Sequence, residues 1–392
     1  MRVTRANGQV AALMVASLLF PALTVDNAKV AGDGIWISRE VVRALSIDGA
    51  PWASLLAISA ESEISGNASL IDQDSTHSRN TMAAGLVAAR LDSDSVRAKV
   101  RAAIKAVIGT EDDRSLRPNR LLQLGRNLPG YVIAADLIQL SSFDPAFDAS
   151  FRMWISDLRT RVFDGFFETI ANADSHDPAN WGAHDGAARA AIAAYLGDTT
   201  DLAQSAAAFR SFAGEVADGR WDYRPDVHDL SWQCSYPRSA EYVPINGECI
   251  RDGHDLSGLL AVDMARGGPY RWPPVYTAYP REDLTGRTLQ AEILYQAGYT
   301  DVYSWGRNGL LRAAQALRRL GSVDGRWFEP AQLVYRIIAT RYGITSWDLS
   351  PISEGRGVAG VDWTHHPGDP STVPSQVGLP ARSYAFALRK SV

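Results

Sequence analysis

The sequence predicts an all-α protein. After the first segment of the chain, apolar side chains recur at three- and four-residue spacing, which is the period of an amphipathic helix. Several of these runs end at a glycine, which suits the left-handed position that follows a helix. No long alternation of apolar and polar residues, typical of a half-buried strand, competes with them. We expect one large domain over residues 31–392.

The helical period predicts about ten helices joined by short turns. In chain order they cover residues 81–90, 94–108, 129–140, 151–171, 183–196, 201–216, 255–266, 281–297, 306–320 and 330–342. Asp201 is expected to cap one of them, and Gly197, Gly298 and Gly321 are expected to follow the ends of three. Successive antiparallel pairs of this kind form a bundle or an α/α toroid.

The two ends of the chain do not follow this pattern. Arg2 and Arg5 precede an apolar run over residues 10–25, which is typical of an export signal and short for a membrane span. We expect a signal peptide over residues 1–30, with an uncleaved anchor as the alternative, and a secreted or periplasmic protein without stable membrane insertion after cleavage. From about residue 348, a Gly/Pro/Ser-rich tail is expected to wrap the surface.

The composition limits the classes of partner. Apolar residues make up 46% of the chain and charged residues 21%, as in an ordinary globular protein. The formal net charge of -5 argues against a general nucleic-acid partner, which needs a positive field, but it permits a local basic cleft for an acidic substrate. The 11 tryptophans belong either to the core or to flat platforms for sugar rings.

Two segments interrupt the helices. Residues 217–253 and 267–280 are rich in aromatic residues and proline and have no helical period. Long irregular segments inside a compact helical domain often carry function. The first segment contains Cys234 and Cys249, and an even cysteine count in an exported chain predicts a disulfide. Two thiols alone are too few for a structural zinc site.

Three short segments place polar and charged side chains at predicted helix starts. Asn180 and His184 precede an Ala-rich helix, where free N–H groups favour an anion, although Asn180 also suits a simple helix cap. Arg251 and His254 open a second helix and either clamp a carboxylate and exchange a proton or are solvated charges. Arg126 is a candidate carboxylate ligand or a surface arginine.

The sequence predicts no metal ion and no cofactor. Residues 72–74 (Asp-Gln-Asp) lack the glycine and the distal glutamate of a calcium loop, and His365 with His366 lacks a helical partner at metal-binding spacing. Glycine motifs for nucleotides and the strand-to-helix elbow of a nucleophilic serine do not occur in the sequence.

Seven blocks stand out in order: LGRNLPGYVIAADLIQL (124–140), NWGAHDGAARAAIAAYLGD (180–198), SWQC (231–234), RDGHDLSGLL (251–260), RGGPYRWPP (266–274), LQAEILYQAGYTDVYSW (289–305) and DWTH (362–365). Their order and content resemble the secreted bacterial branch of the alginate lyase superfamily of polysaccharide lyases. The resemblance covers roughly residues 70–365.

The resemblance implies an incomplete α/α toroid with a groove for an anionic polysaccharide, and cleavage of a uronic-acid polymer by β-elimination. In that reaction a neutraliser pairs with the C5 carboxylate, a base removes the C5 proton, and an acid protonates the leaving oxygen. Asn180 matches the first Asn of the Asn-Asn-His motif of alginate lyases. Trp181 and Gly182 stand where the second Asn and the His are expected, so alginate, mannuronan and glucuronan all remain open as substrates.

The resemblance also implies roles for single residues. Asn180 and Arg126 neutralise the carboxylate, while His254, with Arg251 as its charge partner, is the base or the acid. Its partner in the proton transfer is expected to be either His184 or a tyrosine, Tyr242 or Tyr131. The remaining expected substrate contacts, mainly flat platforms for sugar rings, are Asn127, Trp181, Trp232, Trp272 and Tyr279.

Two other classes of function stay open. A glycoside hydrolase on the same architecture needs two carboxylates, and the candidates are Asp185, Asp229, Asp252, Asp255 and Glu282. Such an enzyme would release reducing ends without new ultraviolet absorbance. A non-catalytic carbohydrate-binding protein would bind polymer without making product, and His254→Ala would leave its binding unchanged.

Overall fold

The structure is a computed structural model that describes residues 34–60, 68–113, 119–163, 167–221, 230–234, 243–329, 332–351 and 357–365. The predicted signal peptide, Tyr242, Asp229, His366 and most of the C-terminal tail lie outside the described residues. The prediction of an all-α protein is confirmed, because the described residues form helices throughout, apart from one small hairpin.

The α-helices are α1 (Arg39–Ala44), α2 (Ala50–Ala60), α3 (His77–Leu91), α4 (Asp94–Val107), α5 (Arg120–Leu137), α6 (Leu140–Phe143), α7 (Pro145–Thr160), α8 (Ile170–His176), α9 (Asn180–Leu196), α10 (Thr199–Ala213), α11 (Ala261–Ala265), α12 (Tyr279–Gln296), α13 (Trp305–Gly321), α14 (Leu333–Arg341) and α15 (Val361–Thr364). The hairpin pairs β1 (Ile250–Arg251) with β2 (His254–Asp255). None of the described helices is long and apolar enough to cross a membrane.

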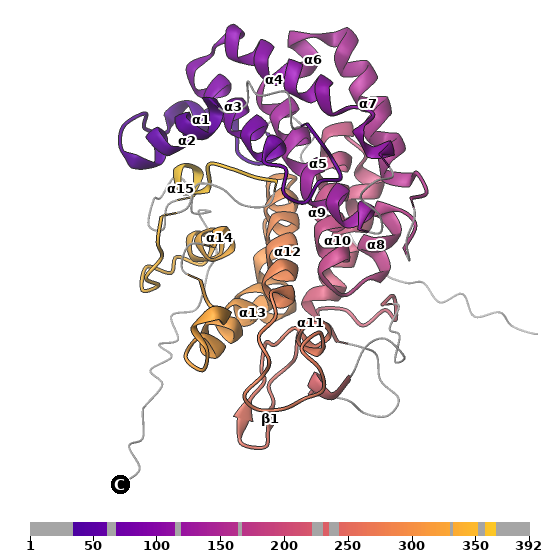
Figure 1. The fold of residues 1–392 in the computed structure, drawn as a ribbon, viewed down its shortest axis with the longest axis vertical. Helices are drawn as coiled ribbons and strands as arrows, with labels where there is room; N and C mark the ends of the chain where they lie inside the picture. Colours follow the sequence, from indigo (N-terminus) through magenta and orange to yellow (C-terminus); the bar gives the residue numbers. More distant parts are fainter. Residues whose placement is uncertain are drawn as a thin grey trace, which may run out of the picture.

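Five helices form a row in which each contacts the next: α3, α5, α9, α12 and α14 (Figure 1). Neighbours in the row run in the same direction. Near the start of α3, Ser78 donates a hydrogen bond to Asn127 of α5, and two turns later Gly85 lies against Ala134. The pairs α9 with α12 and α12 with α14 show the same parallel order of contacts.

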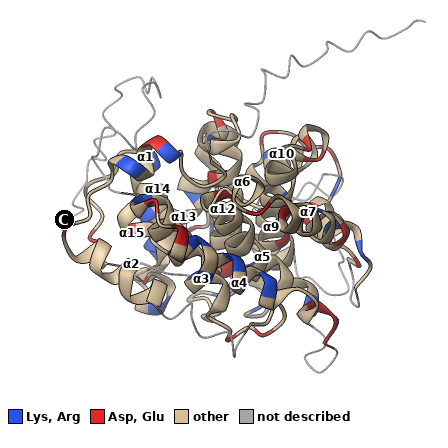
Figure 2. Cartoon of the chain, turned by 90° about the horizontal axis from the view of Figure 1, so that it is seen from above, with Lys and Arg blue, Asp and Glu red and all other residues tan. Residues whose placement is uncertain are grey.

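Between members of the row, the chain returns through further helices that pack on them. α4 packs on α3 and α5, α10 packs on α9 and α12, and α13 packs on α12 and α14. The core lies between these two sets of helices, where the apolar stripes meet. Basic and acidic residues are interspersed along the helices when the molecule is seen from above (Figure 2).

Glycines set the spacing in the middle of the row. A Cβ atom added at Gly125 of α5 would lie 2.4 Å from the Asp185 side chain of α9. A Cβ atom added at Gly286 of α12 would lie 2.5 Å from the backbone carbon of Ala183. The backbones of α5, α9 and α12 therefore approach more closely than any residue with a side chain permits.

The segment 255–266 is not the predicted helix. Asp252 and Gly253 have φ angles of 51° and 80°, so the chain turns back on itself and pairs Arg251 with His254 across the hairpin. Only the five residues of α11 are helical. The predicted helix start at Arg251–Asp255 was therefore wrong, because a left-handed turn of this kind is incompatible with a continuing helix.

Three other predicted boundaries also differ. The predicted helix over 151–171 is broken, because α7 ends at Thr160 and α8 begins only at Ile170. α5 begins nine residues before its predicted start and contains Pro129 in its interior. Almost every side chain along α5 is buried, and this tertiary packing outweighs the low helix propensity of proline. Asp198 rather than Asp201 caps α10, accepting a hydrogen bond from the backbone N–H of Asp201.

Residues 357–365, which we name the terminal segment, return to the first helices of the chain. The Trp363 indole N–H donates to the Ser46 carbonyl at 2.7 Å, and its ring lies 5.1 Å from that of Trp52 in α2. Gly357, at the start of the segment, lies against the backbone of Arg126 and beside Gly130 of α5. The terminal segment therefore joins the end of the described chain to its beginning.

Candidate functional site

A pocket of about 390 Å³ lies beside the row of helices. Its lining comes from the loop before α3 and from α3, α5, α12, α14 and the terminal segment. The lining residues are Gln73, Asp74, Ser75, Thr76, Arg79, Gln123, Arg126, Asn127, Arg281, Glu282, Thr285, Gln332, Leu333 and Gly357. A volume of this size accommodates a small organic ligand or one end of a longer one.

Two helices, α3 and α14, begin at the pocket. Thr76 and Gln332 precede them, and neither side chain accepts a hydrogen bond from a backbone N–H group of its own helix. At the start of α3, Ser75 accepts a hydrogen bond from the His77 N–H, and Thr76 accepts one from the Asn80 side chain. By contrast, α4 and α10, on the other side of the row, are capped by Ser93 and Asp198. The N–H groups and the positive dipole ends at the pocket therefore favour a negatively charged ligand.

The charged side chains of the pocket add to this preference. Arg79, Arg126 and Arg281 come from three different helices, and the opposing carboxylates are those of Asp74 and Glu282. Three guanidinium groups face two carboxylates in a protein whose overall net charge is -5. The pocket is thus a local basic site, which the negative net charge of the whole chain did not exclude.

The centre of the pocket is an ion pair across the row. Arg126 of α5 donates from Nη2 to Oε2 of Glu282 in α12 at 2.9 Å. Nε2 of His184 in α9 lies 3.5 Å from the same oxygen of Glu282. Arg126 is only 8% exposed and His184 is fully buried, whereas Glu282 faces the pocket. Three helices of the row therefore meet at this Arg126–Glu282–His184 cluster.

Gln123 contributes a further polar group to the pocket. Its side chain is 3% exposed, and among the described residues its Oε1 atom has no hydrogen-bond partner. Burying an amide without partners costs free energy, so a ligand or water that bonds it is favoured. The sequence analysis missed Gln123 because it lies in a stretch of α5 that was expected to precede the helix.

Asn127 and Tyr131 lie further along α5. The amide nitrogen of Asn127 donates to the Leu70 carbonyl at 2.9 Å, which fixes the loop before α3 at the rim of the pocket. Tyr131 is fully buried, and its hydroxyl group shares a 2.8 Å hydrogen bond with Nδ1 of His77. Burial raises the pKa of Tyr131 and lowers that of His77, so both groups are neutral near pH 7. The burial of Tyr131 does not fit its predicted contact with substrate.

Asn180 is the first residue of α9 but not its cap. The carboxylate of Asp177 takes that role, accepting hydrogen bonds from the backbone N–H groups of Ala179 and Gly182. Asn180 is itself buried and does not line the pocket, although His184 one turn later contacts Glu282. Trp181 beside it is partly buried against the core.

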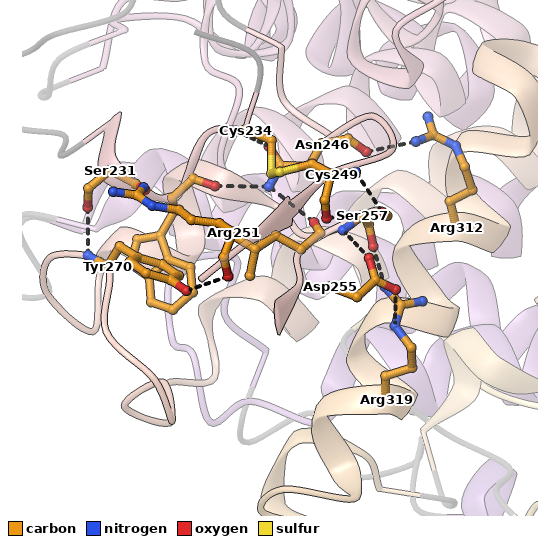
Figure 3. The surroundings of a disulfide bond; sticks show 12 residues. Ser231, Cys234, Asn246, Cys249, Arg251, Asp255, Ser257, Tyr270, Arg312 and Arg319 are labelled. Carbon is orange, nitrogen blue, oxygen red and sulfur yellow. Dashed lines mark hydrogen bonds and ion pairs between the residues drawn. A yellow bond between two sulfur atoms is a disulfide. The ribbon is translucent and has the colours of Figure 1, made fainter. Parts of the chain in front are cut away.

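Residues 230–234 and 243–278, which we name the disulfide module, hold the second group of predicted residues. The predicted disulfide between Cys234 and Cys249 is present (Figure 3). Arg251 donates to the Ser231 carbonyl, and its guanidinium lies 4.2 Å from the centre of the Tyr270 ring (Figure 3). These contacts hold Arg251 within the module.

The aromatic side chains of the disulfide module pack mainly on each other. The rings of His254 and Trp272 stack at 4.1 Å with an angle of 10° between their planes. Trp232 is only 1% exposed, and its indole N–H donates to the Gly268 carbonyl. Trp232 therefore cannot stack on a sugar ring as predicted, because its faces are covered by the module itself.

The predicted residues thus fall into two groups. Arg126 and Asn127 line the pocket, and His184 lies directly behind Glu282. Arg251, His254 and the aromatic residues of the disulfide module are not part of the lining. Tyr279 is the first residue of α12, directly after the disulfide module, and the Arg266 guanidinium lies 4.3 Å from the centre of its ring.

A buried acidic pair adjoins the pocket on the inner side of α12. Asp263 of α11 and Asp283 of α12 are both buried. Burial raises the pKa of Asp283 to about 7, against the opposing charge of Arg287. Burial, together with the charge of Asp283, raises the pKa of Asp263 well above its usual value. No sequence signal distinguished these residues from solvated helix positions.

The described residues contain no cluster of three or more His, Cys, Asp or Glu side chains able to hold a metal ion. No family model, curated protein or solved structure matches the chain.

Proposed function

We propose that the protein is an exported polysaccharide lyase that cleaves a uronic-acid polymer by β-elimination on an incomplete α/α toroid. The order of the seven sequence blocks supports the family and the reaction. The row of parallel helices, with further helices packed on its members, supports this arrangement. The disulfide suits an exported protein.

The observation that carries the proposal is the position of Arg126. Its guanidinium is largely withdrawn from water and lines a pocket with two further arginines and the starts of two helices. A guanidinium pairs with a carboxylate through two parallel hydrogen bonds, which makes Arg126 suited to the C5 carboxylate of a uronate. Neutralising that carboxylate stabilises the enolate-like intermediate that forms when the C5 proton leaves.

The proton transfers follow from the groups around Arg126. Glu282 faces the pocket and His184 stands behind it at 3.5 Å, so the pair forms a route for a proton between ligand and protein interior. His254 keeps the alternative role of base or acid for a polymer that extends over the disulfide module. Trp272 and Tyr279, both partly exposed, remain the proposed sugar platforms there, and Asn180 a proposed neutraliser.

The test is incubation of the purified protein with alginate, mannuronan, glucuronan and other uronans at several pH values. We expect ultraviolet absorbance from a new carbon–carbon double bond with at least one polymer. Arg126→Gln should reduce the rate by about 10²-fold or more, because an electrostatic group at the developing charge is lost. Absence of new absorbance with every polymer would disprove the lyase function.

A glycoside hydrolase is the second candidate, because the pocket contains two carboxylates, those of Asp74 and Glu282. A hydrolase needs a pair of carboxyl groups flanking the scissile bond. In the same incubations, new reducing ends without ultraviolet absorbance would identify hydrolysis, and Asp74→Asn and Glu282→Gln would each abolish it.

A further inference from the structure

The Arg126–Glu282 ion pair occupies the position that an anionic ligand of Arg126 would take. Glu282 is itself a carboxylate, and its Oε2 atom accepts a 2.9 Å hydrogen bond from the Nη2 atom of Arg126 inside the pocket. A ligand carboxylate and the Glu282 carboxylate therefore compete for one guanidinium. An oxoanion that binds Arg126 would share the guanidinium with Glu282, and the repulsion between the two negative charges opposes its binding.

The ion pair between Arg126 and Glu282 stabilises the folded protein when no ligand is bound. Arg126 is 8% exposed, and a guanidinium withdrawn from water without a counter-ion is strongly destabilising. Glu282 supplies that counter-ion from the first turn of α12. The ion pair thus keeps the pocket stable when it holds no ligand.

The structure also provides a second partner for Glu282. Nε2 of His184 lies 3.5 Å from Oε2, on the side away from the open pocket, and belongs to a third helix. When Glu282 leaves Arg126, it can move closer to His184 and accept a hydrogen bond from Nε2, so that its charge keeps a partner. Backbone N–H groups at the starts of α3 and α14 offer further donors to the incoming anion.

We propose that Glu282 is an intramolecular competitor for the ligand anion: it holds Arg126 in the empty pocket and moves to His184 when an oxoanion binds. The oxoanion is the carboxylate of a uronate or the sulfate ester of a sugar. This inference deepens the proposed function but depends only on anion binding. It predicts that the empty site binds anions more weakly than its arginines alone would.

The test measures the affinity of the folded full-length protein for D-glucuronate and for inorganic sulfate by isothermal titration calorimetry, with D-glucose as the uncharged counterpart. Glu282→Gln keeps the size and the hydrogen bonds of the side chain but removes its charge. We expect binding of the anion to tighten about tenfold, which corresponds to about 1.4 kcal/mol. D-glucose should show no such change. Tightening for glucuronate identifies a carboxylate site, and tightening for sulfate alone identifies a site for sulfate esters.

Glu329→Gln is the matched control. Glu329 pairs with Arg281 of the same pocket at 3.1 Å, but half of its side chain is exposed, so water and salt screen it. We expect this variant to change affinity by less than about twofold. Equal tightening in both variants would show a general effect of net charge and would overturn the proposal.

Weaker anion binding by the Glu282→Gln variant would also decide the question. If Glu282 only positions Arg126 for the ligand, Glu282→Gln weakens binding, and the competitor role is wrong. No binding of either anion by the wild type and the variant also overturns it. Adding Arg126→Gln to Glu282→Gln should remove the gain in affinity. If Glu282→Gln does not fold, Glu282→Asp replaces it; its shorter side chain reaches Arg126 less well, so we expect a smaller gain. Tighter anion binding without lyase activity would leave this inference standing while disproving the proposed function.

Discussion

At the scale of single residues, the interior of the protein contains a pair of buried carboxyl groups. Asp263 and Asp283 face each other between α11 and α12, with Asp177 contributing a further unfavourable charge. Arg287 is the nearest compensating cation to Asp283, its Nε atom lying 3.8 Å from the carboxyl group. The pair therefore remains at least partly protonated in the folded protein, which links stability to pH.

Asp283→Asn is expected to flatten the pH dependence of stability. Below about pH 4 Asp283 is protonated in both the folded and the unfolded chain. As pH rises, the unfolded chain loses this proton first, whereas the folded chain keeps it until about pH 7, so stability falls through this window. The neutral amide has no proton to lose, and the variant should be more stable than wild type at pH 7 by on the order of 2 kcal/mol.

Urea unfolding of both proteins at pH values between 4 and 8 measures this difference. Asp255→Asn, an exposed residue of the hairpin, is the control and should follow the wild-type curve. An unchanged slope for Asp283→Asn would mean that Asp283 is ionised across the whole range.

Sequence reasoning located some of these residues and missed others for a physical reason. Arg126 was found because it lies just before a predicted helix start, although it proved to lie inside α5. Glu282 was considered only as one of several acids. Its pairing with Arg126 depends on two helices separated by 156 positions, which no local pattern reveals.

At the scale of helices, the row depends on close backbone approach. Gly286→Ala places a methyl group against the backbone of Ala183, where neither helix can yield without moving its neighbours. We expect a loss of about 1–3 kcal/mol in the free energy of unfolding, as for other overpacked cores. Denaturant unfolding checks the loss, and Gly247→Ala is the control, since its Cβ meets no atom within 4 Å. Equal stability of the two variants would contradict the close packing of α9 and α12.

Most helices were predictable because their apolar stripes are long and periodic, as in α4 and α13. The helix that was wrongly predicted also has a local explanation. The run over 255–266 has helical spacing, yet Asp252 and Gly253 form a left-handed turn just before it and convert its start into a hairpin. The order of the parallel row, in contrast, arises from contacts between distant segments and could not be read from periodicity.

At the scale of the whole molecule, the pocket and the disulfide module are separate parts of one chain. The pocket lining contains no residue of the module, although several residues of both were predicted to act together. The module is held by a bridge between cysteines 15 positions apart and by the contacts of Arg251. The two parts therefore respond differently to loss of the bridge.

Replacing both Cys234 and Cys249 by serine should lower the stability of the disulfide module by about 3 kcal/mol, as expected for a closed loop of this length. Sulfate binding at the pocket should change by less than about twofold, because the four helices that line it stay in place. Calorimetry with sulfate and unfolding monitored by tryptophan fluorescence test the two effects. Loss of sulfate binding in a double variant that is otherwise folded would show that module and pocket form a single site.

The terminal segment has a consequence for the order of events in synthesis and export. The residues that line the pocket are spread along the chain from Gln73 to Gly357, and Trp363 packs on residues near the start of the described chain. While the chain is still emerging from a ribosome or a membrane channel, these residues cannot meet. The arginines then remain apart from one another, and the proposed anion site is complete only after residue 357 has been made.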